Sequence, residues 1–504
     1  MNKKILSILI SGIVVVSGVV VVYYFLTQGD SPSGNGAENP RVEGWMEDFN
    51  ALYDFIEANY PYLWVKNRTH GYNWLDLRYS YVERIANAES DVEFVRILLD
   101  AVDALQNRHT NFINPFDYSM YRDWFENAFY PLNEIFSDPD VNATSYWSAT
   151  YRTADHQKYN RRFAANIAYD KGEYVIQNTG SWTSLYGEDL RVVAVNGTPI
   201  DDVIKDTYEL DYIDYDYERN KSFLWAISPR DFGQGAMFTV RNSSGHEADI
   251  TFSTFSGYSG YPYSYPPAIV DTELWPDESV AYLYVSTFEW SIIQNYLGTF
   301  SDFYDQIEDY DHLIIDVRGN TGGNYQSWIE GIVEPLISED MELQAYLAYR
   351  TDDYSNAFRE GMGITTELAK ESFAYLPPEA YGDEFAIYNY LHSFTPTGNW
   401  NFSGSIVVLT DHVVYSACEA FALFCKQTGF AALHGTTTGG DGLMAFPTLF
   451  KLPNSKLILN MVSALGLDIT GHANEELRTR PDVLYESSLG NFSELIDYVR
   501  ENLP

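Results

Sequence analysis

The stretch "HLIIDVRGNTGGN" (residues 312–324) decides the fold of this chain. It begins as an apolar run and ends in a glycine-rich turn, a pattern typical of a strand buried in a parallel sheet. Gly322 and Gly323 would let a backbone N–H group approach a bound carbonyl closely, because glycine has no side chain. A phosphate-binding loop is disfavoured, since G-x-x-x-x-G-K-[ST] is absent and the turn holds no lysine.

Strands and helices alternate on both sides of this stretch. Such alternation predicts an α/β layer built on a mostly parallel sheet, which we expect over residues 273–504. The predicted strands are "VAYLYVSTF" (280–288), "SIVVLT" (405–410) and "AALHG" (431–435), a hairpin is predicted over 449–462, and helices are predicted over 292–307, 325–337 and 416–428.

The chain before this layer divides into two further regions. In residues 41–125 apolar residues recur every three or four positions, which predicts an N-terminal helical domain. Its helix over 90–105 opens with a Ser90/Glu93 capping box and leaves His109 in the loop just beyond its end.

In residues 126–272 apolar and polar residues alternate with a period near two, which predicts a β-rich middle domain. Within it, "YGEDLRVVAVNGTPIDDVI" (186–204) resembles part of a PDZ module, a type of domain that binds peptide C-termini, although the usual carboxylate-binding loop is absent.

Residues 1–40 predict a membrane anchor followed by a flexible tether. Lys3 and Lys4 precede a mainly apolar run of 22 residues from Ile5 to Leu26, which as a helix would span about 33 Å, enough for the ~30 Å hydrocarbon layer. The lysines favour a cytoplasmic N-terminus, so the rest of the chain is expected outside the cytoplasm. The long apolar core favours an uncleaved anchor over a cleaved signal peptide. If the segment were cleaved, the protein would be secreted.

Composition excludes several classes of partner. The net charge of −40 repels nucleic acid, while 16% aromatic residues indicate a globular chain. We expect no metal and no cofactor, since no H-E-x-x-H, paired-cysteine or EF-hand motif occurs. The two cysteines, Cys418 and Cys425, lie two helical turns apart, too far for a disulfide.

Ser416, in "VVYSACEAF" (413–421), has two interpretations. With Glu419 it forms an S-x-x-E capping box, which needs no chemistry. The same position places its hydroxyl at the positive end of a helix dipole, where a developing oxyanion is stabilised.

The turn at 312–324 and "SIVVLTDHVVYSACEAFALFCKQTGFAALHGTTTGGDG" (405–442) together resemble the C-terminal processing, or tail-specific, serine peptidases, whose relatives include the tricorn core protease. The order of the motifs, their spacing and their flanking strands carry this resemblance, which covers residues 278–484. It implies a crotonase-like α/β core.

The resemblance also implies roles for individual residues. Ser416 matches the family's nucleophile. The oxyanion hole would use the backbone N–H groups of Ala417 and of Gly322 or Gly323.

The family's lysine base is missing, because Asp441 occupies its place. An aspartate, with a pKa near ~3.9, is a poor base for a serine hydroxyl. Histidine is the natural substitute, and His109 resembles the base of the tricorn-like branch, with His412 and His434 as alternatives. By the same resemblance Glu475 would orient His109.

Arg108 stands where tricorn has a linking serine, and an Arg108–Glu475 ion pair is one expected replacement for that link. The sequence thus predicts a membrane-anchored, extracytoplasmic serine endopeptidase acting on peptides or proteins. The alternative is a catalytically inactive protein that binds peptides or lipophiles on the same scaffold, suggested by the missing lysine. The oligomeric state cannot be derived from the sequence.

Overall fold

The structure, a computed structural model, describes residues 40–503 except 126, 138–144, 160–166, 178–181, 234, 252–264, 401 and 444–445. The predicted anchor at residues 5–26 lies outside the described residues. Within the described ranges, no helix is both long enough and apolar enough to cross a membrane. Residues 44–504 form one compact unit, so the predicted boundaries at 125 and 272 remain predictions.

A six-stranded sheet forms the centre of the region over residues 270–503. Strands β12, β13, β17, β18 and β22 run parallel, and β11 pairs antiparallel at the edge beside β12. The predicted mostly parallel sheet is confirmed. In order across the sheet the strands are β11 (Val270–Trp275), β12 (Val280–Val285), β13 (His312–Asp316), β17 (Ser405–Thr410), β18 (Ala432–Gly435) and β22 (Val483–Leu484).

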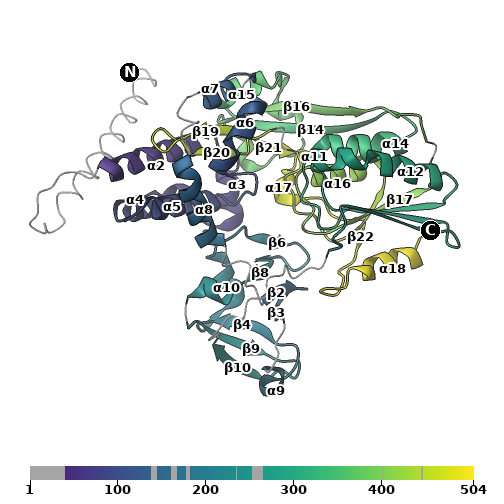
Figure 1. The fold of residues 1–504 in the computed structure, drawn as a ribbon, viewed down its shortest axis with the longest axis horizontal. Helices are drawn as coiled ribbons and strands as arrows, with labels where there is room; N and C mark the ends of the chain where they lie inside the picture. The colour runs from purple at the N-terminus through teal and green to yellow at the C-terminus, as the bar shows by residue number, and fades with distance from the viewer. Residues whose placement is uncertain are drawn as a thin grey trace, which may run out of the picture. The chain divides into compact units, whose positions relative to one another are not determined.

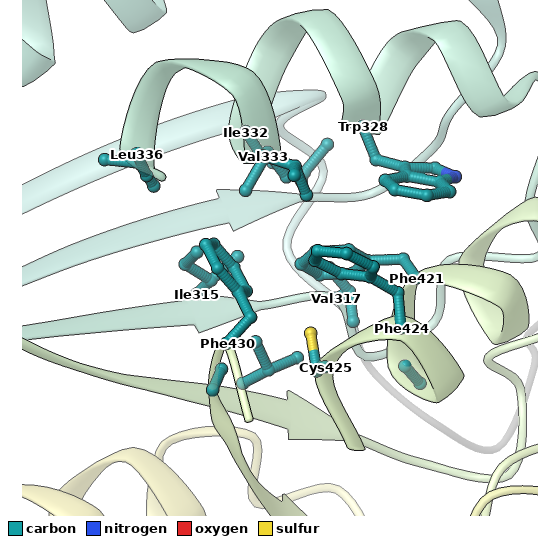
Figure 2. Packing of buried hydrophobic residues seen from close by; sticks show 14 of the residues in the cluster. Ile315, Val317, Trp328, Ile332, Val333, Leu336, Phe421, Phe424, Cys425 and Phe430 are labelled. Carbon is teal, nitrogen blue, oxygen red and sulfur yellow. The ribbon is translucent and has the colours of Figure 1, made fainter. Parts of the chain in front are cut away.

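Helices cover both faces of this sheet (Figure 1). On one face Ile315 of β13 packs with Trp328 and with Phe424 and Phe430, as Figure 2 shows. On the other face Ile314 packs against α18. Because both faces of β13 are buried under helices, the side chains on both faces of the strand are apolar, and its sequence is an unbroken apolar run. The helices of this region are α11 (Trp290–Ile293), α12 (Leu297–Ile307), α13 (Tyr325–Trp328), α14 (Glu334–Leu336), α15 (Asp353–Gly361), α16 (Ala417–Thr428), α17 (Asn474–Leu477) and α18 (Ser493–Glu501). Both cysteines are free and buried in α16, as expected.

Two smaller antiparallel sheets extend the region over residues 270–503. One has the order β15 (Glu367–Leu368), β16 (Phe385–Phe394), β14 (Met341–Arg350), β21 (Ala464–Leu467). The other joins the predicted hairpin, β19 (Thr448–Lys451) and β20 (Ile458–Met461), to β1 (Asn111–Phe112), with Asn111 opposite Asn460. This pairing attaches the loop that carries His109 to the same region.

The upstream chain is helical and then β-rich, but its helices continue through α8 into the predicted β-rich region, and the strands of that region begin only at β2. Ser90 caps α5, where its hydroxyl accepts a hydrogen bond from the Glu93 N–H over 3.2 Å. The helices are α2 (Pro40–Asn59), α3 (Leu63–His70), α4 (Arg78–Ala86), α5 (Asp91–Asp103), α6 (Tyr118–Phe125), α7 (Leu132–Ser137), α8 (Ser145–Tyr159), α9 (Trp182–Tyr186) and α10 (Ile200–Lys205). One sheet joins β10 (Glu247–Thr251), β9 (Met237–Arg241), β4 (Arg191–Val195), β3 (Glu173–Ile176), β2 (Ile167–Asp170) and β8 (Ala226–Ile227), with β5 (Thr198–Pro199) on β4, while β6 (Asp214–Asp216) pairs with β7 (Lys221–Phe223).

The burial of β13 generates a stability prediction. Leu313→Ala removes a fully buried side chain, and it should lower the free energy of unfolding by about 2–5 kcal/mol. Leu391→Ala, at a β16 position that is 44% exposed, is the matched control and should change it by less than ~0.5 kcal/mol. Urea unfolding followed by fluorescence measures both, and equal losses would contradict the buried position of β13.

Candidate active site

Ser416 immediately precedes α16 with a backbone that non-glycine residues seldom adopt. Its φ of 58° and ψ of −126° lie outside the helical and extended regions. Its side chain makes no capping hydrogen bond. Glu419, the other half of the expected capping box, is instead buried and accepts hydrogen bonds from Asn474 Nδ2 (2.6 Å) and Thr479 Oγ1 (2.7 Å). The capping interpretation of Ser416 is therefore wrong, and its hydroxyl is available for another partner.

That partner is His109, whose Nε2 lies 2.8 Å from Ser416 Oγ. The two residues are 307 positions apart in the sequence. Both backbone groups of His109 form hydrogen bonds. Its N–H donates to Asn107 Oδ1 (3.0 Å), and its carbonyl accepts from Asn460 Nδ2 (2.9 Å). The imidazole also packs against the Tyr415 ring, with 4.8 Å between the ring centres. These contacts hold the ring with Nε2 directed at Ser416 Oγ.

Asp441 lies on the other side of the imidazole. Its Oδ2 is 2.8 Å from His109 Nδ1, and only 1% of its side chain is exposed. A carboxylate at Nδ1 keeps the proton on that nitrogen, so Nε2 carries the free lone pair. The aspartate that is a poor base for a serine hydroxyl thus lies where it can hold the orientation of the His109 ring.

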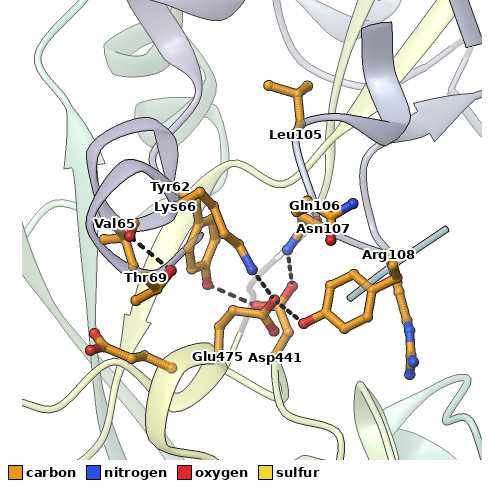
Figure 3. A network of polar contacts seen from close by, with 12 residues as sticks. Tyr62, Val65, Lys66, Thr69, Leu105, Gln106, Asn107, Arg108, Asp441 and Glu475 are labelled. Atoms are coloured by element: carbon orange, nitrogen blue, oxygen red, sulfur yellow. Dashed lines mark hydrogen bonds and ion pairs between the residues drawn. The ribbon is translucent and has the colours of Figure 1, made fainter. Parts of the chain in front are cut away.

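Asp441 accepts three further hydrogen bonds. Tyr62 donates to Oδ1 over 2.8 Å, and Asn107 Nδ2 (2.8 Å) and the Tyr415 hydroxyl (3.2 Å) donate to Oδ2. Figure 3 shows the bonds from Tyr62 and Asn107. Burial raises the pKa of Asp441, but the hydrogen bond and charge of His109 and the bonds from Asn107 and Tyr62 outweigh it, so the pKa lies below its ordinary value. The carboxylate is therefore ionised near neutral pH.

Glu475, expected to orient His109, is bound elsewhere, and this corrects the prediction. It is buried on α17 and accepts a hydrogen bond from Lys66 Nζ (2.9 Å), which Figure 3 shows, and another from the Tyr212 hydroxyl (2.8 Å). The physical reason is that Asp441 already occupies His109 Nδ1, while the Lys66 ammonium supplies the charge partner of Glu475.

The expected Arg108–Glu475 pair is also replaced. The Arg108 guanidinium packs over the Tyr212 ring at 4.4 Å, and its Nη2 lies 3.7 Å from Asp214 Oδ2. The alternative bases lie in other surroundings: His412 stacks on Trp225, and His434 belongs to β18. Burial lowers the pKa of both histidines.

The glycine turn packs directly on the start of α16. A Cβ on Gly322, whose φ is +101°, would lie 2.7 Å from Ser416 Cβ and 2.9 Å from the Ala417 nitrogen. The Gly322 N–H already donates to Asn320 Oδ1 over 2.9 Å. In the described part of the chain, no acceptor is recorded for the N–H groups of Gly323 and Ala417. Of the two glycines expected in the oxyanion hole, the geometry favours Gly323.

Sequence reasoning missed Asp441, Tyr62, Lys66 and Tyr212 as parts of this network. A signal for Asp441 was present, because it occupies the place of the family's lysine in "TGGDG". Nothing in the sequence connects Tyr62 and Lys66 to residues about four hundred positions away.

One protein family and several solved structures are similar to this chain. Residues 279–485 match peptidase family S41. No curated protein sequence matches the chain. Among solved structures, mature CPAF is 14% identical with a TM-score of 0.52, covering 92% of this chain and 97% of its own. Mature CPAF complexed with lactacystin is 13% identical with a TM-score of 0.51, covering 92% and 98%. The photosystem II D1 C-terminal processing protease is 14% identical with a TM-score of 0.39, covering 88% and 93%.

The likeness to mature CPAF shows a shared fold, and the family match falls on the segment that carries both sequence motifs. The resemblance drawn from those motifs is thereby confirmed. Residues 279–485 of this chain match peptidase family S41, and the chain is a serine peptidase.

Proposed function

We propose that this chain hydrolyses peptide bonds through an acyl-enzyme, with Ser416 as nucleophile, His109 as general base and Asp441 as the group that orients the base. The observation that carries the proposal is the continuous chain of contacts Ser416 Oγ to His109 Nε2 (2.8 Å) and His109 Nδ1 to Asp441 Oδ2 (2.8 Å). Nucleophile, base and orienting carboxylate in hydrogen-bond contact are the arrangement that serine hydrolysis requires.

Each step follows from these contacts. As Ser416 Oγ attacks the carbonyl carbon, its proton passes to His109 Nε2, and Asp441 stabilises the imidazolium that forms. The N–H groups of Gly323 and Ala417 donate to the oxyanion of the tetrahedral intermediate. The imidazolium then protonates the leaving amine, which breaks the peptide bond and leaves the acyl-enzyme. Water attacks the ester with His109 again as base, releasing the acid and restoring Ser416.

The backbone of Ser416 supports the same role. A non-glycine residue at φ 58° costs about 1–3 kcal/mol and persists where the surroundings enforce it. This conformation directs Oγ toward His109 instead of toward the free N–H groups of α16. The inactive-binder alternative rested on the missing lysine, and an imidazole within 2.8 Å of Oγ removes that reason.

The finer parts of the proposal rest on the sequence. The apolar run at 5–26 supports an anchored, extracytoplasmic endopeptidase. The motif resemblance supports a crotonase-like topology for the core. The stretch at 186–204 supports a PDZ-like β-domain that presents substrate to the core.

Covalent labelling tests the nucleophile. A fluorophosphonate probe should attach to Ser416, and His109→Asn should slow the labelling by at least ~10³-fold, because the base is lost. Peptide mapping by mass spectrometry identifies the labelled residue. His246→Asn, in an exposed turn before β10, is the matched control and should label at the wild-type rate. A folded wild-type protein that never labels at Ser416 would falsify the peptidase proposal.

The role of Asp441 generates a second test. Asp441→Asn should lower kcat for peptide hydrolysis by roughly 10³–10⁴-fold while leaving KM nearly unchanged, because the amide stabilises the wrong histidine tautomer. Asp340→Asn, on an exposed turn, is the matched control and should leave kcat unchanged. Steady-state kinetics on a denatured protein substrate measure both. Near-normal kcat in Asp441→Asn would show that another group orients His109.

A further inference from the structure

The two loops that form the active site are joined at the side chain of Asp411. The loop after β13 contains the glycine turn, and the loop after β17 leads to Ser416. Asp411 is the first residue after β17. Its Oδ1 accepts a hydrogen bond from the Val413 N–H in its own loop (3.0 Å) and another from the Gly319 N–H in the neighbouring loop (3.2 Å). One carboxylate oxygen therefore connects the loop of the nucleophile to the loop of the glycine turn.

Two further contacts follow along the same pair of loops. The Tyr415 N–H donates to the Asn320 carbonyl over 3.3 Å. Beyond it, a Cβ on Gly322 would lie 2.7 Å from Ser416 Cβ, so the two backbones are as close as glycine allows. These contacts come in order along both loops, and the bonds of Asp411 hold the loops together at the point where they leave the sheet.

The Asp411 side chain is itself held in place. Its Oδ2 accepts a hydrogen bond from the Tyr265 hydroxyl over 2.7 Å. The Tyr265 ring also lies against Gly319, where an added Cβ would approach ring carbon Cδ1 to 2.8 Å. On the backbone side, the Asp411 carbonyl accepts from the Val414 N–H over 3.1 Å, which closes a turn before the nucleophile. An aspartate that accepts from the N–H two residues later, within such a turn, has a defined side-chain direction.

We propose that Asp411 is a positioning residue for the oxyanion hole: by joining the two loops, it sets the distance between the N–H groups of Gly323 and Ala417. The inference rests on the proposed function, in which these two N–H groups stabilise the oxyanion. Asp411 acts through the backbone of the two loops and not on the reacting atoms. Its contribution belongs to the transition state, because the oxyanion forms only as Ser416 attacks.

Asp411→Ala tests the connection, because it removes the acceptor from both N–H groups. The two loops can then shift against each other, and a displacement of about 1 Å in an active site costs roughly 10²-fold in rate. We expect kcat for hydrolysis of a denatured protein to fall by roughly 10²-fold. KM should stay within about threefold of the wild-type value, because the lost interaction is one made in the transition state.

Two variants control for a general loss of structure. Asp411→Asn keeps an Oδ1 that can accept from the same N–H groups, and its amide can donate to the Tyr265 hydroxyl oxygen, so kcat should stay within about threefold of the wild-type value. Asp352→Ala is the matched control, because Asp352 likewise accepts from the N–H two residues later, that of Tyr354 (2.9 Å), where it caps α15. Its loss should lower stability without changing kcat.

A peptide aldehyde gives a readout that a purely structural role would not change. The probe carries the sequence that precedes a mapped cleavage site in the denatured substrate. Ser416 Oγ adds to its carbonyl carbon, and the carbonyl oxygen of the resulting tetrahedral adduct occupies the oxyanion hole. In Asp411→Ala the inhibition constant of the aldehyde should rise by the same factor, roughly 10², by which kcat/KM falls. In Asp411→Asn and Asp352→Ala it should stay near the wild-type value.

The outcomes separate two kinds of failure. A wild-type protein that neither hydrolyses the substrate nor labels at Ser416 overturns the proposed function itself. Unchanged kcat in folded Asp411→Ala, or a fall in kcat with unchanged aldehyde affinity, overturns the Asp411 inference alone. So does an Asp411→Asn variant as impaired as Asp411→Ala. If Asp411→Ala does not fold, Asp411→Ser replaces it: the shorter hydroxyl can still accept from the Val413 N–H but not reach the Gly319 N–H, and the same two losses are expected.

Discussion

The buried carboxylate of Asp441 is the interaction on which the rest of this structure depends. It accepts hydrogen bonds from Tyr62 before α3, from Asn107 in the histidine loop and from Tyr415 before α16, besides its contact with His109. An ionised carboxylate is tolerated inside a protein only when its oxygens are satisfied. Tyr62 and Asn107 lie more than three hundred residues before Asp441, so satisfying this one group ties the N-terminal helical region to the region of the parallel sheet. In the proposed mechanism the same carboxylate also orients the base.

The sheet topology explains why the two sequence motifs meet. Strands β13 and β17 are parallel neighbours, with His312 opposite Ser405 and Asp316 opposite Leu409, so both loops leave the same edge. One loop becomes the glycine turn and the other leads to Ser416. Their approach is so close that any side chain at Gly322 would overlap Ser416. The close approach of Ser416 therefore requires glycine at this position, and both residues have a positive φ.

Local patterns predicted the parts of the fold that local forces determine. The apolar run of β13, the cap of α5 at Ser90 and the hairpin at 449–462 are each set by neighbouring residues, and each forms as expected. The contact between Ser416 and His109 could be predicted because the family resemblance pairs these two distant residues. Asp441 was misjudged because only its basicity was considered. A low pKa disqualifies a base, yet it is what an orienting anion needs, and the hydrogen bonds that lower it come from residues far away in sequence. Glu475 was misassigned because its partner, Lys66, lies 409 positions away.

The large negative charge of the chain has little influence on this site. Charges on the surface are screened by salt over about 10 Å, whereas groups enclosed in the protein are screened far less. Among the described residues, the enclosed carboxylates Asp441, Glu475 and Asp214 lie near the cations Lys66, Arg108 and Arg478, and the buried Glu419 lies close to this set. In the proposed reaction the imidazolium of His109 forms directly beside Asp441, whose Oδ2 lies 2.8 Å from Nδ1. The carboxylate in contact with that ring is therefore the group placed to stabilise the proposed charged intermediate.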